Sequence, residues 1–104
     1  MSKYLLVYHG GSMPESEAEQ AKVMDAWSAW FGELGPALVD GGNPVAATKT
    51  ITPGGKISEG GNNPASGYSL IEARNLDEAV RAAKGCPVLA SGGSIEVAET
   101  FNAM

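Results

Sequence analysis

The chain has very little of the residue types that build metal centres and disulfide frameworks. It contains one cysteine, Cys86, and one histidine, His9, among 104 residues. A single cysteine cannot form an internal disulfide, which is typical of a protein kept in a reducing compartment. One histidine and one cysteine cannot form a zinc site by themselves, because such sites take three or four protein ligands. We therefore expect no metal, no cofactor and a cytoplasmic location.

Long apolar runs and an excess of positive charge are also missing. No run of about 18 apolar residues occurs, so the sequence predicts no membrane span, and the N-terminus lacks the features of a signal peptide. The net charge of −5 predicts an acidic surface that repels phosphate, so we expect no nucleic-acid partner. A composition of 43% hydrophobic and 18% charged residues indicates one globular domain over residues 1–104.

The most informative stretch that is present is residues 3–9, Lys-Tyr-Leu-Leu-Val-Tyr-His. A strand with one face in water alternates polar and apolar residues, whereas residues 4–8 of this stretch are apolar or aromatic without a break. The stretch therefore predicts a central strand covered on both faces. Alternate side chains then point to opposite faces, with Leu5, Val7 and His9 on one and Tyr4, Leu6 and Tyr8 on the other.

A helix is predicted after a connecting loop over residues 10–15. Ser16 and Glu19 have the spacing of a capping box, and Gly35-Pro36 is a helix stop. Between them lies an apolar stripe at spacings of three and four, made of Val23, Ala26, Trp27, Trp30, Phe31 and Leu34. Such a stripe indicates that the helix lies across a sheet.

The middle of the chain is predicted to be extended and broken by turns. We expect a short strand over 37–40, a bend at 41–44 and a strand over 45–52, followed by a turn at 53–55. Residues 56–58 can then fold back as a small hairpin. The loop over 59–66 is either a mobile cover or interface arm, or a plain surface loop.

The last third predicts a strand over 67–73, a helix capped by Asn75 and ended by Gly85 and Pro87, and a strand over 94–101. The order β-α-β-β-α-β is that of an α+β, ferredoxin-like fold, an antiparallel sheet with both helices on one face. Because the first strand is apolar on both faces, we expect a homodimer in which a second subunit's sheet stacks on the open face. The two sheets would enclose a barrel-like space.

In the order and spacing of its motifs, the chain resembles the YCII-related (DGPF-domain) family. The resemblance rests on residues 3–8, the helix end near Gly35, and residues 39–44, 67–73, 76–79 and 93–97. It implies a dimeric α/β barrel of ferredoxin-like subunits. It also implies that some members use a histidine–aspartate pair as dehydrochlorinases or lactone-isomerase-like enzymes, while others occur beside transcription initiation factors.

The chain departs from that family in two places. Residues 58–61 read Ser-Glu-Gly-Gly where the family has Asp-Gly-Pro-Phe, and residues 24–31 lack the histidine that enzyme-like members carry on the first helix. The family's aspartate after the second strand matches Asp40. His9, on a different element, is then the chain's one source of an imidazole.

His9 and Asp40 are accordingly the candidate catalytic residues. Both fall at predicted strand ends beside glycines, and if those ends converge, the carboxylate would orient the imidazole for proton transfer. The alternatives are that His9 is a hydrogen-bonded residue without a catalytic role, and that Asp40 bonds its own backbone in a turn.

Asp25, Trp27 and Tyr68 are candidate ligand-binding residues. A carboxylate beside indole and phenol rings would suit a small apolar or aromatic ligand, although Asp25 on a solvated flank and Trp27 in the core are simpler readings. Two function hypotheses follow. One is an isomerase or lyase of the proton-transfer kind, and the other is a non-catalytic small-molecule-binding or regulatory module linked to transcription.

Overall fold

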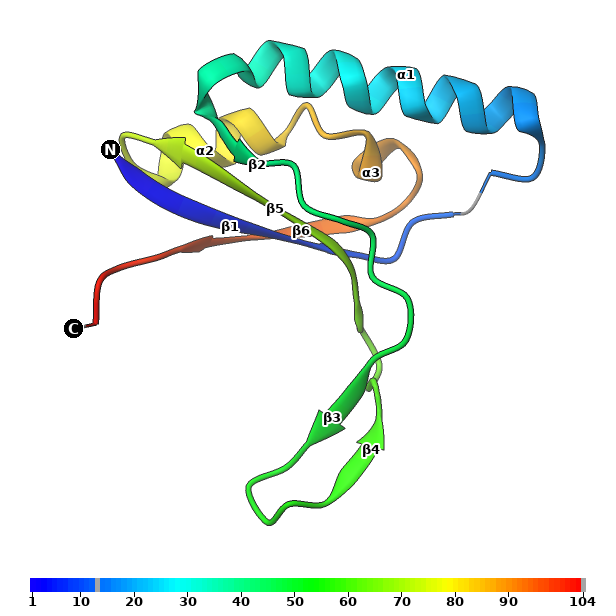
Figure 1. Cartoon of the computed structure of the whole chain (residues 1–104), viewed down its shortest axis with the longest axis vertical. Coiled ribbons are helices and arrows are strands. Elements are labelled where there is room, and N and C mark those ends of the chain that lie inside the picture. The colour runs from blue at the N-terminus through cyan, green and yellow to red at the C-terminus, as the bar shows by residue number, and fades with distance from the viewer. Residues whose placement is uncertain (13, 104) are drawn as a thin grey trace.

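The computed structural model describes residues 1–12 and 14–103. Figure 1 shows the elements in chain order, which are β1 (Ser2–His9), α1 (Glu17–Leu34), η1 (Gly35–Ala37), β2 (Leu38–Asp40), β3 (Lys49–Ile51), β4 (Ile57–Glu59), β5 (Ala65–Ala73), α2 (Leu76–Ala83), α3 (Pro87–Ala90) and β6 (Ser94–Glu99).

Strand β1 lies in the middle of a four-stranded antiparallel sheet, as its unbroken apolar run predicts. The strand order is β2-β5-β1-β6, and β1 pairs along its length with β5 and β6. Leu5 lies opposite Leu70 on one side and Ala98 on the other. This α+β arrangement is compatible with a ferredoxin-like fold.

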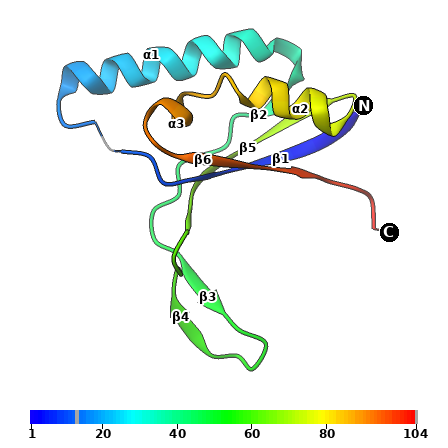
Figure 2. The ribbon, with the colours of Figure 1, turned by 180° about the vertical axis from the view of Figure 1, so that it is seen from behind.

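The helices cover one face of this sheet, and no helix of the described residues lies over the other face (Figures 1 and 2). The core therefore lies between the helices and the face that carries Tyr4, Leu6 and Tyr8, all three of which are buried. Ile71 of β5 and Trp30 of α1 complete its centre. The indole Nε1 of Trp30 donates to the carbonyl of Ala82 at 3.1 Å, which ties α1 to α2.

Helix α1 begins and ends where its sequence predicts. The Ser16 hydroxyl accepts from the backbone N–H of Glu19 at 3.2 Å, and the Glu19 carboxylate accepts from the N–H of Glu15 rather than of Ser16. Gly35 ends the helix at φ 54°, a left-handed φ that glycine adopts without strain.

The predicted apolar stripe of α1 is only partly buried, which corrects the sequence analysis. Trp30 is 3% exposed, while Trp27, Phe31 and Leu34 are half-buried. Val23 and Ala26 are exposed. The first turns of the helix extend past the rest of the helical layer (Figure 1), whereas Ala26 lines an open groove together with Pro87 and Ala90 of α3.

The helix-free side of the sheet is called the open face below. Because side chains alternate and paired residues share a face, it consists of Lys3, Leu5, Val7 and His9 of β1, Tyr68, Leu70 and Glu72 of β5, and Ser94, Glu96 and Ala98 of β6. Its centre is apolar, with Leu5, Val7 and Leu70 half-buried.

Strands β3 and β4 form a two-stranded hairpin of their own. The fold-back after residues 53–55 is confirmed, but the predicted strand over 45–52 is wrong in extent, because only Lys49–Ile51 pairs as strand. Upstream, Pro44 forms an isolated bridge to Gly67, and Val45 donates to the Ser66 carbonyl at 3.0 Å. The hairpin projects from the sheet on the side away from the helices (Figures 1 and 2).

Three further features differ from the prediction. Strand β5 begins at Ala65, within the predicted loop over 59–66 and before the predicted start at residue 67. The last strand ends at Glu99 rather than at residue 101, although the N–H of Thr100 still donates to the Lys3 carbonyl at 3.1 Å. Helix α3 was not predicted. This single turn begins after Cys86 with a proline, Pro87, at its first position. The first backbone N–H of a helix has no acceptor within the helix, so proline, which has no N–H, is well suited to that position.

The chain exposes more surface than its size requires. Its accessible surface is 7308 Å², whereas a compact protein of 10.7 kDa exposes about 5,500 Å². Its radius of gyration is 15.1 Å, against about 13 Å for a compact domain of this length. The uncovered sheet face and the projecting hairpin account for this shape.

Among the helices of the described residues, none combines the length and apolar character that crossing a bilayer requires.

Candidate functional site

His9 ends β1 at the rim of the open face, with its ring held by the backbone of the segment that precedes β5. Its Nδ1 lies 3.0 Å from the carbonyl oxygen of Asn63 and 3.3 Å from that of Pro64. A carbonyl oxygen can only accept, so these contacts require the proton on Nδ1. In the neutral ring, the free lone pair is therefore on Nε2.

Nε2 is buried and has no hydrogen-bond partner among the residues that the structure describes. The nearest carboxylate in ion-pair range is that of Glu96, whose Oε1 lies 3.5 Å away, with side-chain exposures of 14% for His9 and 70% for Glu96. The register explains the contact, because Ser94 lies opposite His9 and Glu96 opposite Val7, a diagonal neighbour on the same face. A proton taken up at Nε2 would create an imidazolium beside an acidic group.

Asp40 has a different partner. Its Oδ1 accepts from the backbone N–H of Gly42 at 2.8 Å, the turn geometry in which a short acidic side chain bonds its own backbone. Gly42 follows with φ 73°, and a Cβ there would collide with the carbonyl oxygen of Tyr68. Asp40 thus shapes the bend after β2, and among the described residues the carboxylate that approaches the imidazole is that of Glu96.

The candidate ligand-binding residues fall on two sides of the sheet. Tyr68 is on the open face opposite Val7, and its hydroxyl accepts from the amide of Asn43 at 3.4 Å. Trp27 lies on the helix side, where its ring meets that of Tyr8 edge-on at 5.3 Å and 72°. Asp25 is exposed on the same helix. The open face therefore carries His9, Tyr68 and Glu96, of which His9 and Glu96 are in contact.

A buried hydrogen-bond chain supports the sheet beneath this face. The Tyr8 hydroxyl donates to Ser69 at 2.7 Å, and the Ser69 hydroxyl donates to the Gly41 carbonyl at 2.7 Å. Burial raises the pKa of Tyr8 well above its ordinary value, and burial also raises the pKa of the Cys86 thiol. Both groups stay protonated at neutral pH, so we assign them a structural role.

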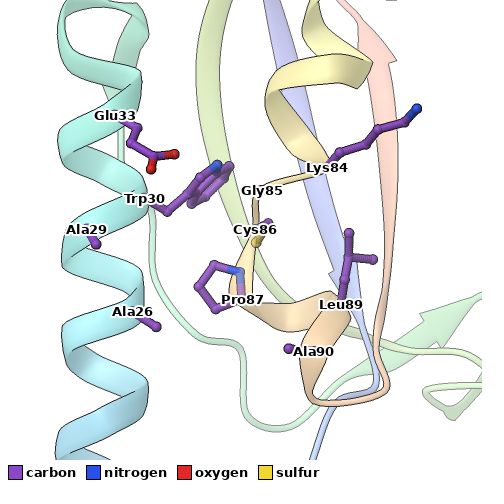
Figure 3. A pocket seen from close by; sticks show the side chains of 10 residues that line it. All are labelled: Ala26, Ala29, Trp30, Glu33, Lys84, Gly85, Cys86, Pro87, Leu89 and Ala90. Atoms are coloured by element: carbon purple, nitrogen blue, oxygen red, sulfur yellow. The ribbon is translucent and has the colours of Figure 1, made fainter.

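A groove of about 450 Å³ lies on the helix side, between α1 and the segment from α2 to α3 (Figure 3). Its lining is mostly apolar, with one acidic and one basic side chain: Ala26, Ala29, Trp30, Glu33, Lys84, Gly85, Cys86, Pro87, Leu89 and Ala90. The sheet separates this groove from His9, so the groove is distinct from the candidate site on the open face.

Glu96 is the residue of this site that sequence reasoning missed. Its signal was the alternation of the last strand, which places Glu96 two residues after Ser94 on one face. Alternation alone does not identify Glu96 as the diagonal neighbour of His9, because that depends on strand register.

Comparison with models of known protein families gives no match, and comparison with curated proteins gives none either. Over residues 1–12 and 14–103, no three acidic, histidine or cysteine side chains are grouped so as to hold a metal ion.

Proposed function

We propose that this chain acts as a homodimer in which two open faces stack and enclose a small apolar molecule. The support is the open face itself, where Leu5, Val7 and Leu70 form an apolar centre without a covering layer. The surface surplus, about 1,800 Å² per chain, matches the roughly 1,000–2,500 Å² that each subunit buries in a large homodimer interface. The same assembly agrees with membership of the YCII-related family, which we also propose.

The chemistry that this site supports best is proton transfer by His9, as in an isomerase or lyase. The observation that carries the proposal is the orientation of the ring. The Asn63 carbonyl holds the proton on Nδ1, so Nε2 is the basic nitrogen. Nε2 would take a proton from a carbon beside an electron-withdrawing group of the ligand, breaking the C–H bond. Glu96 would stabilise the imidazolium, and the proton would return at another carbon or a leaving group would depart.

A non-catalytic binding module is the second candidate, and one observation favours it. Nε2 is already covered within the single chain, so a substrate must displace a neighbouring group to reach it. Glu96 is the exposed neighbour that can move. If Glu96 stays in place, the space between the sheets binds a ligand without reaction.

Binding is tested with N-phenyl-1-naphthylamine, a neutral apolar dye that fluoresces when it leaves water. We expect saturable binding that is lost in Val7→Glu, because a charge at the centre of stacked sheets is left unpaired. Met24→Glu is the matched control, since Met24 is 67% exposed on α1. Equal dye binding by Val7→Glu would contradict the proposed site.

Catalysis is tested by deuterium exchange from solvent into small unsaturated lactones and enones. We expect His9→Gln to slow exchange at least about 100-fold, the usual contribution of a general base. Glu96→Gln should slow it more than Asp40→Asn does, because Glu96 lies beside the ring and Asp40 lies in a turn. Dye binding without exchange by the unchanged protein would select the binding module.

A further inference from the structure

We propose that the β3–β4 hairpin is an arm that packs on the open face of a second copy of this chain and helps to close the space between the sheets. This inference rests on the proposed homodimer. It adds the segment through which each subunit completes the ligand site of the other.

The hairpin carries an apolar pair that its own chain leaves in water. Ile51 and Ile57 lie directly opposite each other in the β3–β4 ladder, so both side chains are on the same face of the ribbon. They are 70% and 62% exposed. A two-stranded ribbon is marginal in water without a covering layer, and a paired apolar patch on such a ribbon is typical of an interaction surface.

The position of the hairpin matches that of a second subunit. The ribbon leaves the sheet on the helix-free side (Figures 1 and 2). Among the described residues, β3 and β4 pair only with each other and add no strand to the main sheet. A subunit that stacks on the open face would therefore meet the arm, and two-fold symmetry would give it an arm of its own to place on the first subunit.

Charge is compatible with a second copy of this acidic chain, because the hairpin is the more basic part of it. The hairpin carries two lysines, Lys49 and Lys56, and one acidic residue, Glu59, which pairs with Lys49 in the β3–β4 ladder. It therefore has one positive charge in excess, in a chain of net charge −5. On the open face Lys3 lies opposite Glu72, which leaves Glu96 beside His9 as an exposed acidic group. The excess positive charge of the arm and the exposed Glu96 of the open face are complementary when two copies meet.

The arm is also connected to the catalytic candidate. Strand β4 leads directly into residues 60–64, and the carbonyls of Asn63 and Pro64 hold the His9 ring. An arm anchored on the partner would fix this segment and, through it, the orientation of the imidazole. Dimer assembly would then contribute both the cover of the site and the position of its base.

The test is the dimer dissociation constant of an Ile51→Ser, Ile57→Ser double variant, measured by sedimentation velocity over a dilution series. We expect it to rise at least about 100-fold, because two-fold symmetry removes four isoleucines from the interface. Met24→Ser is the control, an exposed apolar residue on α1 that should leave the constant unchanged. Circular dichroism should show both variants folded.

A Lys49→Glu, Lys56→Glu variant provides a second measurement that keeps both isoleucines. We expect weaker dimerisation at low salt and a smaller difference at high salt, since screening weakens the repulsion from the acidic face. Dissociation constants equal to that of the unchanged protein in both variants would overturn the arm and leave the homodimer intact. An unchanged protein that is monomeric would overturn the homodimer and the arm together.

Discussion

The two faces of the sheet are formed by alternate residues of the same strands, yet the two faces have different surroundings. On the helix side, Tyr4, Leu6 and Ile71 have no exposed surface. On the open face, Leu5 and Val7 are only half-buried. Helices of the same chain cover the first face, and no helix within residues 1–12 and 14–103 covers the second. An apolar face that its own chain leaves uncovered is typical of an interface, and this difference is the basis of the proposed dimer.

The largest expected effect is on the covered face. Trp30→Ala should lower the free energy of unfolding by about 3–5 kcal/mol, because it removes a large side chain from a packed core. The indole is 3% exposed, and its loss also leaves the Ala82 carbonyl without this donor. The measurement is urea unfolding by circular dichroism, and a loss below about 1 kcal/mol would mean that Trp30 is outside the core.

A pair of adjacent leucines compares the two faces directly. Leu6→Ala should cost about 2–5 kcal/mol at any protein concentration, since Leu6 is fully buried within one chain. Leu5→Ala should lower the free energy of unfolding by less than Leu6→Ala does. This loss should become smaller as the protein is diluted, because in the proposed dimer a second subunit covers Leu5. Unfolding at high and low protein concentration measures both. Equal and concentration-independent losses would remove the distinction between the faces.

A pair of tyrosines makes the same comparison for hydrogen bonds. Tyr8→Phe removes the buried donor to Ser69 and should cost about 1–2 kcal/mol in unfolding free energy. Tyr68→Phe removes a hydroxyl that accepts a 3.4 Å bond on the open face and should change stability by less than about 0.5 kcal/mol. A larger cost for Tyr68→Phe than for Tyr8→Phe would contradict the burial of these two rings.

The smallest effect concerns an exposed ion pair at the start of α2. The side-chain hydrogen bond from Arg74 holds the pKa of Glu78 below its ordinary value. A carboxyl group whose pKa is lower in the folded chain than in the unfolded chain stabilises the fold at pH values above its unfolded pKa. That stabilisation is lost as the pH falls through the folded pKa, so the loss occurs at acidic pH. In an NMR titration, Arg74→Gln should return the Glu78 pKa toward 4.5, and Arg81→Gln should move it less.

The sequence predicted the elements whose signals are local. The unbroken apolar run at residues 4–8 identified the central strand, because a strand without alternation is typical of the middle of a sheet. Ser16 and Gly35 located the ends of α1, since capping acts within one turn. The order of these elements was sufficient for the α+β class.

The sequence did not predict the features that depend on strand register or on how far a helix or strand extends past its neighbours. Val23 is exposed because the first turns of α1 extend past the rest of the helical layer, and the spacing of the apolar residues does not reveal this. The observed strand β3 is shorter than the predicted strand over 45–52, because residues 46–48 have no strand partner among the described residues. The carboxylate beside His9 comes from Glu96 because of the β1–β6 register, and Asp40 is used by its own turn.

Sedimentation equilibrium of the unchanged protein at micromolar concentration tests the central claim most directly. If a second copy covers the open face, the mass will be about twice 10.7 kDa, and Val7→Glu will reduce it to that of one chain while Met24→Glu leaves it unchanged. A mass of 10.7 kDa for the unchanged protein would contradict the account, because the apolar centre of the open face would then have no partner.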